Sequence, residues 1–325
     1  MEHSADPPPA AEPTGIPVRA PATATAHHPG ARRIGGAPIS WGACEVPGWG
    51  EMPDPETVLD EMARLGLRGT ELGPPGFLPH DPGALASRLR HRGLEFVGSF
   101  VPLVLHERDA DSARRMARDT LALLSQAGGQ VLVIAVVQDL QWSPPRDLDD
   151  AAWRRLAAHA AEIESLATER GITFALHPHV GTLIETAAQV ERGLAETTVG
   201  WCLDTGHLVI GGTDPAQFAR EHGDRVTHVH LKDVDGDIAA EVRAGRLSLL
   251  QATQRGLFRP LGRGVAKVAA TLAALDEHGY DGWLVLEQDT AITADEPAVT
   301  NAPMLDTQES IAFLNTAQRT EEINQ

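Results

Sequence analysis

The sequence predicts an α/β fold of the (β/α)8 class, a TIM barrel built as a single domain. Eight short apolar runs follow one another along the chain, and segments with the periodicity of amphipathic helices lie between them. The runs are almost continuously apolar, which is typical of strands buried on both faces of a parallel sheet. They span residues 34–290, close to the length of about 250 residues that one such barrel uses. No G-x-G-x-x-G or P-loop motif follows any run, which argues against a doubly wound sheet.

The elements can be justified in chain order. The first helix is expected at 54–66, because Asp54 can cap it, Pro55 suits its first position and Gly66 ends it. The segments 111–129 and 149–171 also end at glycine, and 214–223 and 264–279 follow the same pattern. The predicted strands are 33–42, 67–73, 94–103, 130–137, 172–179, 199–207, 226–233 and 282–289.

Three segments lie outside this alternation. Residues 1–33 are rich in Pro and Ala with almost no large apolar residue, and we expect a disordered tail. Residues 238–264 are too long for a simple crossover, and predict either a lid-like helix and loop over the barrel mouth or an extended structural helix. Residues 291–325 are expected to form a C-terminal extension with a helix that packs on the barrel 34–290.

Composition narrows the classes of function. The chain carries 27 Lys and Arg against 45 Asp and Glu, a formal charge of −18. Such a surface repels phosphate backbones, so we expect no nucleic-acid partner, and the acidity is typical of a solubility adaptation. Two cysteines and no C-x-x-C pair suit a reducing cytoplasm. No apolar stretch approaches the roughly 20 residues that span a bilayer, and the N-terminus lacks the apolar core of a signal peptide. We therefore predict a cytoplasmic protein with no membrane partner.

Polar residues gather where the predicted strands end, which is where TIM barrels place their active sites. One histidine at a strand end is more often a hydrogen-bonded core residue than a ligand. Burial alone does not explain so many on different strands. Imidazoles and carboxylates together suit Mn²⁺, Co²⁺, Zn²⁺ or Fe²⁺, and the lack of thiolates points to an open catalytic site. The residues at the strand ends are Glu71, His177, His179, Asp204, His207, His230, Lys232, Asp233 and Glu287.

Four motifs carry a resemblance. "LHPHVGTLIET", "CLDTGH", "HVHLKD" and "VLEQD", in this order, resemble the xylose-isomerase-like TIM-barrel superfamily of sugar isomerases and epimerases. Within it, "APISWG", "GTELGPPGFLP" and "HPHVGT" are most similar to inosose dehydratases, which remove water from a keto-inositol. The resemblance implies a cyclic polyol or sugar as substrate. It also implies a divalent metal, with Mn²⁺ or Co²⁺ as first choices and Mg²⁺, Zn²⁺ and Fe²⁺ as alternatives.

The resemblance also implies roles for single residues. His177 stands where many members of the superfamily have a metal-binding glutamate, and which of His177 and His179 is the ligand stays open. The metal ligands implied are His177, Asp204, His230 and Glu287. The catalytic residues implied are Glu71, His207, Lys232 and Glu287, with Glu287 or Glu71 as base and His207, His179 or Lys232 as acid. The substrate contacts implied are Trp41, Glu45, His179 and Glu185.

Two departures from the family pattern bear on the reaction. His177 in place of glutamate removes one of the two carboxylates that epimerases use on opposite faces of a carbon, which favours a single proton abstraction. The Asn-Asp-Asp run of many inosose dehydratases is replaced by "WGACEVPGWG", where Glu45 is the one carboxylate.

We therefore predict a metal-dependent lyase that dehydrates a keto-inositol through a metal-stabilised enediolate. The alternatives are a sugar isomerase or epimerase, and a non-catalytic sugar-binding barrel. Trp49 and Trp142 either stack on a sugar or pack under loops, and the helices leave a homo-oligomer open.

Overall fold

The computed structural model describes residues 32–44, 46, 48–291 and 303–324. The predicted tail 1–33 therefore lies almost wholly outside the described residues, and so does Glu45. Within the described ranges, no helix is long and apolar enough to cross a bilayer.

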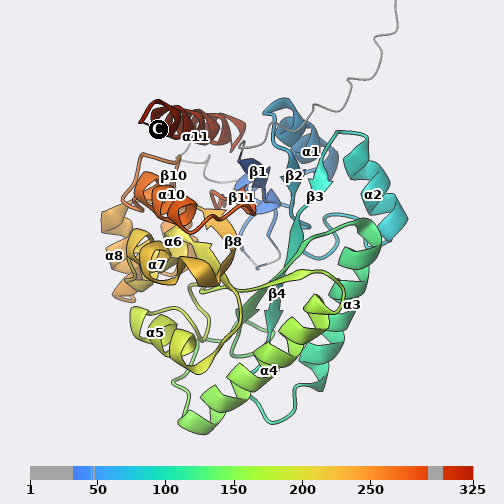
Figure 1. Cartoon of the computed structure of the whole chain (residues 1–325), viewed down its shortest axis with the longest axis vertical. Helices are drawn as coiled ribbons and strands as arrows, with labels where there is room; N and C mark the ends of the chain where they lie inside the picture. Colours follow the sequence, from blue (N-terminus) through green and yellow to red (C-terminus); the bar gives the residue numbers. More distant parts are fainter. Residues whose placement is uncertain (1–31, 45, 47, 292–302, 325) are drawn as a thin grey trace, which may run out of the picture. The chain divides into compact units, whose positions relative to one another are not determined.

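The barrel is built from parallel strands (Figure 1). β3 and β4 are separated by Val97 alone, and together they form one strand. The Val97 N–H donates to the Thr70 carbonyl beside β2, and the Val97 carbonyl accepts from Gln130 and Val131 beside β5. The sheet order β3-β2-β1-β11-β8-β7-β6-β5-β4 thus closes on itself as eight strands, and the TIM-barrel prediction is confirmed. The strands are β1 Arg33–Gly36, β2 Gly69–Thr70, β3 Glu95–Phe96, β4 Gly98–Leu103, β5 Val131–Val136, β6 Thr173–Leu176, β7 Trp201–Asp204, β8 Val226–Leu231 and β11 Trp283–Leu286.

Helices follow the strands, and their starts are set by local caps. The carboxylates of Asp54, Asp149 and Asp214 accept backbone N–H bonds at the first turns of α1, α4 and α7. The five predicted helices are present as α1 Pro55–Arg64, α3 Asp111–Ala127, α4 Asp150–Thr168, α7 Pro215–His222 and α10 Val268–Glu277. Three more were not predicted, namely α2 Pro82–Arg90, α5 Ala187–Glu196 and α6 Thr205–Gly211.

Helix α6 begins inside the predicted strand 199–207 and continues beyond it to Gly211. The strand ends at Asp204, whose Oδ1 accepts the N–H of His207 at 2.8 Å and so caps the helix. The apolar run continues through the junction because both elements are buried, so hydrophobicity alone does not mark the boundary.

The barrel interior changes character from one end to the other. At the amino ends of the strands Trp283 packs with Val97, Val285 and Ala37. Gly69 makes room for this ring, because a Cβ there would lie 3.0 Å from the Trp283 side chain and 2.9 Å from the Glu95 carbonyl. A middle layer holds Val131, Val133, Ala175 and Cys202. Polar side chains fill the carboxyl ends.

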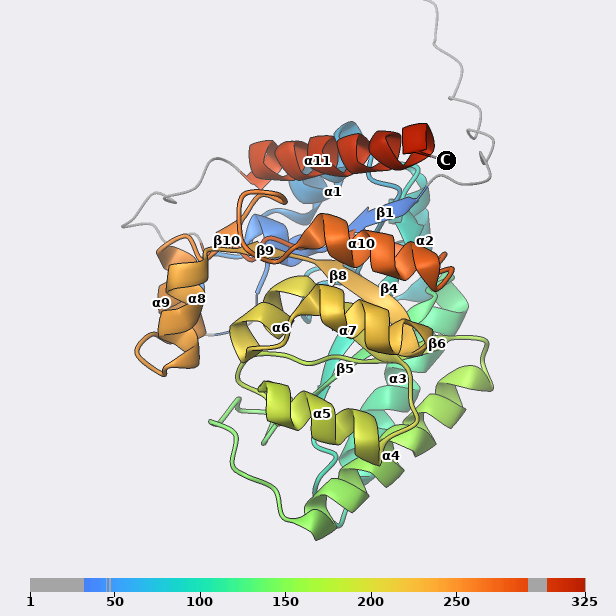
Figure 2. The same cartoon turned by 60° about the vertical axis from the view of Figure 1, so that its left-hand side comes forward.

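The segment 238–264 forms two short helices and one strand of a two-stranded antiparallel sheet, and not one extended helix. The helices are α8 Gly236–Arg243 and α9 Leu249–Gln254, and β10 Phe258–Arg259 pairs antiparallel with β9 Asp233–Val234. Helices α8 and α9 lie side by side at one edge of the barrel (Figure 2). Their apolar side chains form a cluster that also includes Val180 and Ile210 of the barrel. Its Phe258 ring lies with its centroid 5.6 Å from Nζ of Lys232. The insertion therefore borders the carboxyl end of the barrel.

The last helix, α11 Pro303–Asn324, also contacts the barrel. Ser310 Oγ accepts the N–H of Leu261 at 3.0 Å, and Asp306 Oδ2 accepts from the Gln288 amide at 2.6 Å. Leu314 is buried in the main apolar core. A bond to Gln288, next to Glu287, ties this helix to the strand end that carries the site.

Candidate active site

The carboxyl end of the barrel holds a cluster of buried ionisable side chains, here called the mouth cluster. Seven of its nine members were predicted from the sequence. The other two, His228 and Asp289, lie two residues from His230 and Glu287, and residues two apart on a strand share a face. That alternation was the signal that could have found them. The mouth cluster is Glu71, His177, Asp204, His207, His228, His230, Lys232, Glu287 and Asp289, each at most 8% exposed.

Three of these side chains, those of Asp204, His230 and Glu287, converge so that they could hold a metal ion. Nδ1 of His230 lies 3.1 Å from Glu287 Oε2 and 3.7 Å from Asp204 Oδ2. Ligand atoms that share one divalent ion at bonds of about 2.1 Å lie roughly 3.0–3.5 Å apart. Among the described residues, nothing hydrogen-bonds this buried Nδ1. The donors present therefore fit a divalent metal.

His177 joins this group through Asp204. Its Nε2 lies 3.2 Å from Asp204 Oδ2, the same oxygen that faces His230. Burial lowers the pKa of His177, which favours the neutral ring that a metal ligand requires. His179 points elsewhere, with its Nδ1 donating to the Val180 carbonyl at 2.8 Å, provided that nitrogen carries the hydrogen. The geometry favours His177 over His179 as the fourth ligand.

Lys232 links the carboxylates of the cluster. Its Nζ lies 2.9 Å from Glu287 Oε2, 3.0 Å from Asp289 Oδ1 and 3.5 Å from Asp204 Oδ2. Burial lowers the pKa of this amine, but the three carboxylates outweigh it and hold the pKa well above its ordinary value. Burial raises the pKa of Asp289 to about 6, while burial of Glu287 is outweighed by His230 and Lys232, which lower its pKa to about 2. The site therefore holds a charged amine beside an ionised Glu287.

Rings form one wall beside the cluster. Phe100 and Trp142 stack with centroids 6.4 Å apart and an interplanar angle of 11°. The His179 ring lies 5.8 Å from Trp142 and 3.9 Å from His207. Burial lowers the pKa of His179 to about 3, so it is neutral at physiological pH. Trp142 has a left-handed backbone, with φ of 55°, that favours glycine, and such strain is common at functional sites.

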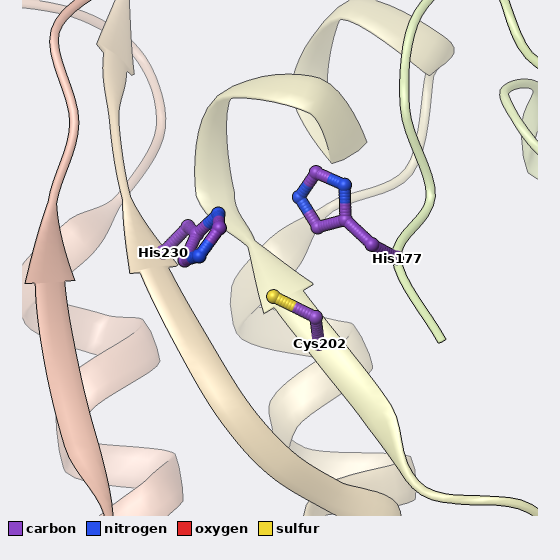
Figure 3. A group of neighbouring side chains, drawn as sticks. All are labelled: His177, Cys202 and His230. Carbon is purple, nitrogen blue, oxygen red and sulfur yellow. The ribbon is translucent and has the colours of Figure 1, made fainter. Parts of the chain in front are cut away.

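Cys202 lies below His177 and His230 (Figure 3). Its sulfur and one nitrogen each of His177 and His230 lie within 4.8 Å of one another. Burial raises the pKa of this thiol, so it stays protonated and lines the site as a small apolar group.

The remaining predicted contacts lie differently. The Trp41 indole donates to Glu61 Oε2 on α1 at 2.7 Å and packs in the main core, so its polar atom is used outside the mouth cluster. Glu185 is half-buried and accepts the Gly181 N–H at 2.8 Å in the loop after β6. Trp49 is buried and donates to the Thr290 carbonyl, as in the loop-packing alternative.

Comparisons with known proteins agree with this geometry. Residues 59–317 match the model of a family described as xylose isomerase-like TIM barrel. An inosose dehydratase of Geobacillus kaustophilus (strain HTA426) is 32% identical over 276 residues, covering 80% of this chain and 89% of the relative. An L-ribulose 3-epimerase structure superposes with a TM-score of 0.65 at 22% identity, over 90% of this chain and 98% of that one. A structure of the IOLI protein with a bound zinc atom gives a TM-score of 0.64 at 14% identity, over 89% and 98%.

Proposed function

The chain belongs to the xylose isomerase-like TIM barrel family, and we propose that it is a divalent-metal-dependent lyase that dehydrates a keto-inositol, as an inosose dehydratase does. The observation that carries the proposal is that the carboxylates of Asp204 and Glu287 both face the buried Nδ1 of His230 at the barrel mouth. The similarity to curated inosose dehydratases supplies the substrate class.

The metal would be held by Asp204, His230 and Glu287, with His177 as the fourth ligand. A bound cation polarises the ketone and stabilises the negative charge that develops on its oxygen. We propose Mn²⁺ or Co²⁺, since imidazole and carboxylate ligands suit both. Zinc is the alternative, because a zinc atom is bound in the IOLI structure, which shares the fold.

The chain's own residues would move the proton. Glu287 is ionised and accepts the proton from the carbon next to the ketone. The electron pair of that C–H bond forms the new C=C bond, and the hydroxyl on the next carbon leaves. Lys232 donates a proton to this hydroxyl, which departs as water.

The contact between Glu287 and Lys232 closes this cycle. Glu287 Oε2 lies 2.9 Å from Lys232 Nζ, so the proton taken by Glu287 can return to the amine. Each turnover then removes one proton from carbon and delivers one to the leaving hydroxyl, with no net change in the protein. Phe100 and Trp142 would pack against the apolar face of the substrate ring.

Product mass tests the proposal. Metal-reconstituted protein is incubated with 2-keto-myo-inositol and the product is followed by mass spectrometry. We expect the loss of one water, abolished by EDTA and by His230→Ala. The control is His91→Ala, which removes an exposed histidine at the end of α2 and should leave the rate unchanged. A new product of unchanged mass would replace the lyase by the isomerase alternative, and no product with no bound metal would end the catalytic proposal.

A further inference from the structure

One carboxylate oxygen at the barrel mouth is bonded by two buried imidazoles. Glu71 follows β2, and its Oε1 lies 3.0 Å from Nε2 of His228 and 3.1 Å from Nε2 of His230 on β8. β2 and β8 are separated by two strands in the sheet order, so the contact crosses the barrel interior. All three residues are at most 3% exposed.

This contact fixes which nitrogen of His230 is available. Glu71 Oε1 lies within hydrogen-bond distance of both ring nitrogens, 3.0 Å from His228 and 3.1 Å from His230. A carboxylate oxygen placed between two imidazole nitrogens accepts a hydrogen bond from each, so Nε2 of His230 carries a hydrogen. Nδ1 is then the one ring nitrogen that can take a metal. It is also the nitrogen that faces Asp204 and Glu287.

From this geometry we infer that Glu71 is a positioning residue for the metal site, acting through His230, and not the base that abstracts a proton. The inference rests on the metal-binding part of the proposed function. It revises the role that the family resemblance implied for Glu71, because one oxygen of this carboxylate already accepts from two N–H groups across the barrel. Carboxylates that orient a ligating histidine typically change metal affinity by about 10- to 100-fold when replaced.

The surroundings of Glu71 support a fixed orientation. Its N–H donates to the Gly36 carbonyl at 3.1 Å, and its own carbonyl accepts the Thr70 hydroxyl at 2.9 Å. His228 lies two residues before His230 and binds the same oxygen, which hinders the carboxylate from turning toward a substrate. The backbone and both imidazoles thus hold one rotamer.

Metal affinity measured without substrate tests the inference. Co²⁺ is titrated into the full chain in competition with a chromophoric chelator, for the wild type and for Glu71→Gln. We expect the dissociation constant of Co²⁺ to rise about 10- to 100-fold, with a change in the visible absorption bands that report its coordination. Unchanged affinity and unchanged bands, with turnover lost, would show that Glu71 is a base and overturn the inference.

Two further variants distinguish loss of the bond between Glu71 and His230 from a general disturbance of the structure. Glu164→Gln alters a carboxylate that accepts the backbone N–H of Gly200, and its affinity for Co²⁺ should match the wild type. His228→Phe leaves the bond between Glu71 and His230 in place, and should change the affinity by less than about threefold. A loss in His228→Phe as large as in Glu71→Gln would refute the role of that one bond.

Folding is checked by circular dichroism. If Glu71→Gln is unfolded, Glu71→Asp keeps the charge but withdraws the oxygen, and should weaken Co²⁺ binding in the same direction. Because the titration uses no substrate, failure of the dehydratase proposal leaves this result interpretable.

Discussion

The two ends of the barrel interior are filled by different kinds of side chain. At the floor, made by Arg33, Glu95, Gln130 and Trp283, an indole ring fills the space and its N–H donates to Gln130 at 3.1 Å. The charged groups stay at the rim, with the Arg33 side chain 26% exposed and Glu95 43% exposed. At the mouth, charged side chains take the place of the ring and are almost wholly buried.

This difference teaches where function lies. Packing explains the floor, because apolar area is removed from water and the indole N–H and Arg33 Nη2 have hydrogen-bond partners. Packing does not explain the mouth cluster, since burying charges costs several kcal/mol per ion and well-packed apolar residues are often as stable. A group of that kind is typical of a site kept for its chemistry.

The largest effect is expected at the mouth, from Asp204→Asn. The amide oxygen can still accept the His207 N–H and cap α6, but the charge that faces His177, His230 and Lys232 is lost. We expect loss of bound metal and a fall in kcat/KM of about 10³- to 10⁴-fold, which is about 4–5.5 kcal/mol. Metal analysis, turnover and thermal unfolding measure the three consequences. Between the metal-free proteins the thermal midpoint should not fall, and a collapse of stability with normal metal content would contradict the comparison.

The next effect is expected at the floor, from Trp283→Ala. Trp283 is 2% exposed, and its removal leaves a cavity that costs about 3–5 kcal/mol of unfolding free energy. Urea unfolding measures the loss. Co²⁺ affinity of the folded fraction should match the wild type, because the ring lies at the opposite end from the ligands. Loss of metal without loss of stability would show that the two ends are coupled.

The sequence alone could predict the barrel and most of its mouth. The eight apolar runs and the glycines that end the helices mark the strands and five of the helices, because buried strands and capped helices have strong local signals. The ends of β2, β6, β7, β8 and β11 place Glu71, His177, Asp204, His230 and Glu287 together once the sheet closes.

The sequence predicted where these residues stand along the chain, but it could not predict the direction in which their side chains point. Trp41 was predicted inside the strand 33–42, but β1 ends at Gly36 and the Trp41 indole turns to Glu61 on α1. Glu71 stands at the expected strand end, yet only the three-dimensional contact shows that two imidazoles occupy its oxygen. The 3₁₀ turn Pro38–Trp41 and the rotamer of Glu71 are set by packing between elements far apart in the chain.

A smaller effect concerns pH at the mouth. Burial holds the pKa of His179 at about 3 in the folded chain, below the ordinary value of 6.5. The unfolded chain binds this proton as pH falls below 6.5 and the folded chain does not, so stability is complete above that pH and is lost toward pH 3. As the pH falls from 6.5 to 5.5, His179 should lower the free energy of unfolding by about 1 kcal/mol. Urea unfolding of His179→Gln should show a pH dependence weaker by that amount, and an identical dependence would refute the assignment.

The smallest effect is expected at the floor rim, from Arg33→Met. The guanidinium carbon lies 4.1 Å from the centroid of the Trp283 ring, and the group donates to Gln130 at 2.9 Å and to Glu95 at 3.2 Å. Cation–π contacts at partly exposed sites contribute about 0.5–1 kcal/mol, so we expect a loss of that size in urea unfolding and no change in turnover. Arg68→Met is the matched control, because Arg68 pairs with the same Glu95 at 3.9 Å, and exposed pairs contribute about 0–1 kcal/mol. Equal losses in the two variants would assign the effect to charge alone. A larger loss in Arg33→Met would assign it to the ring that closes the floor.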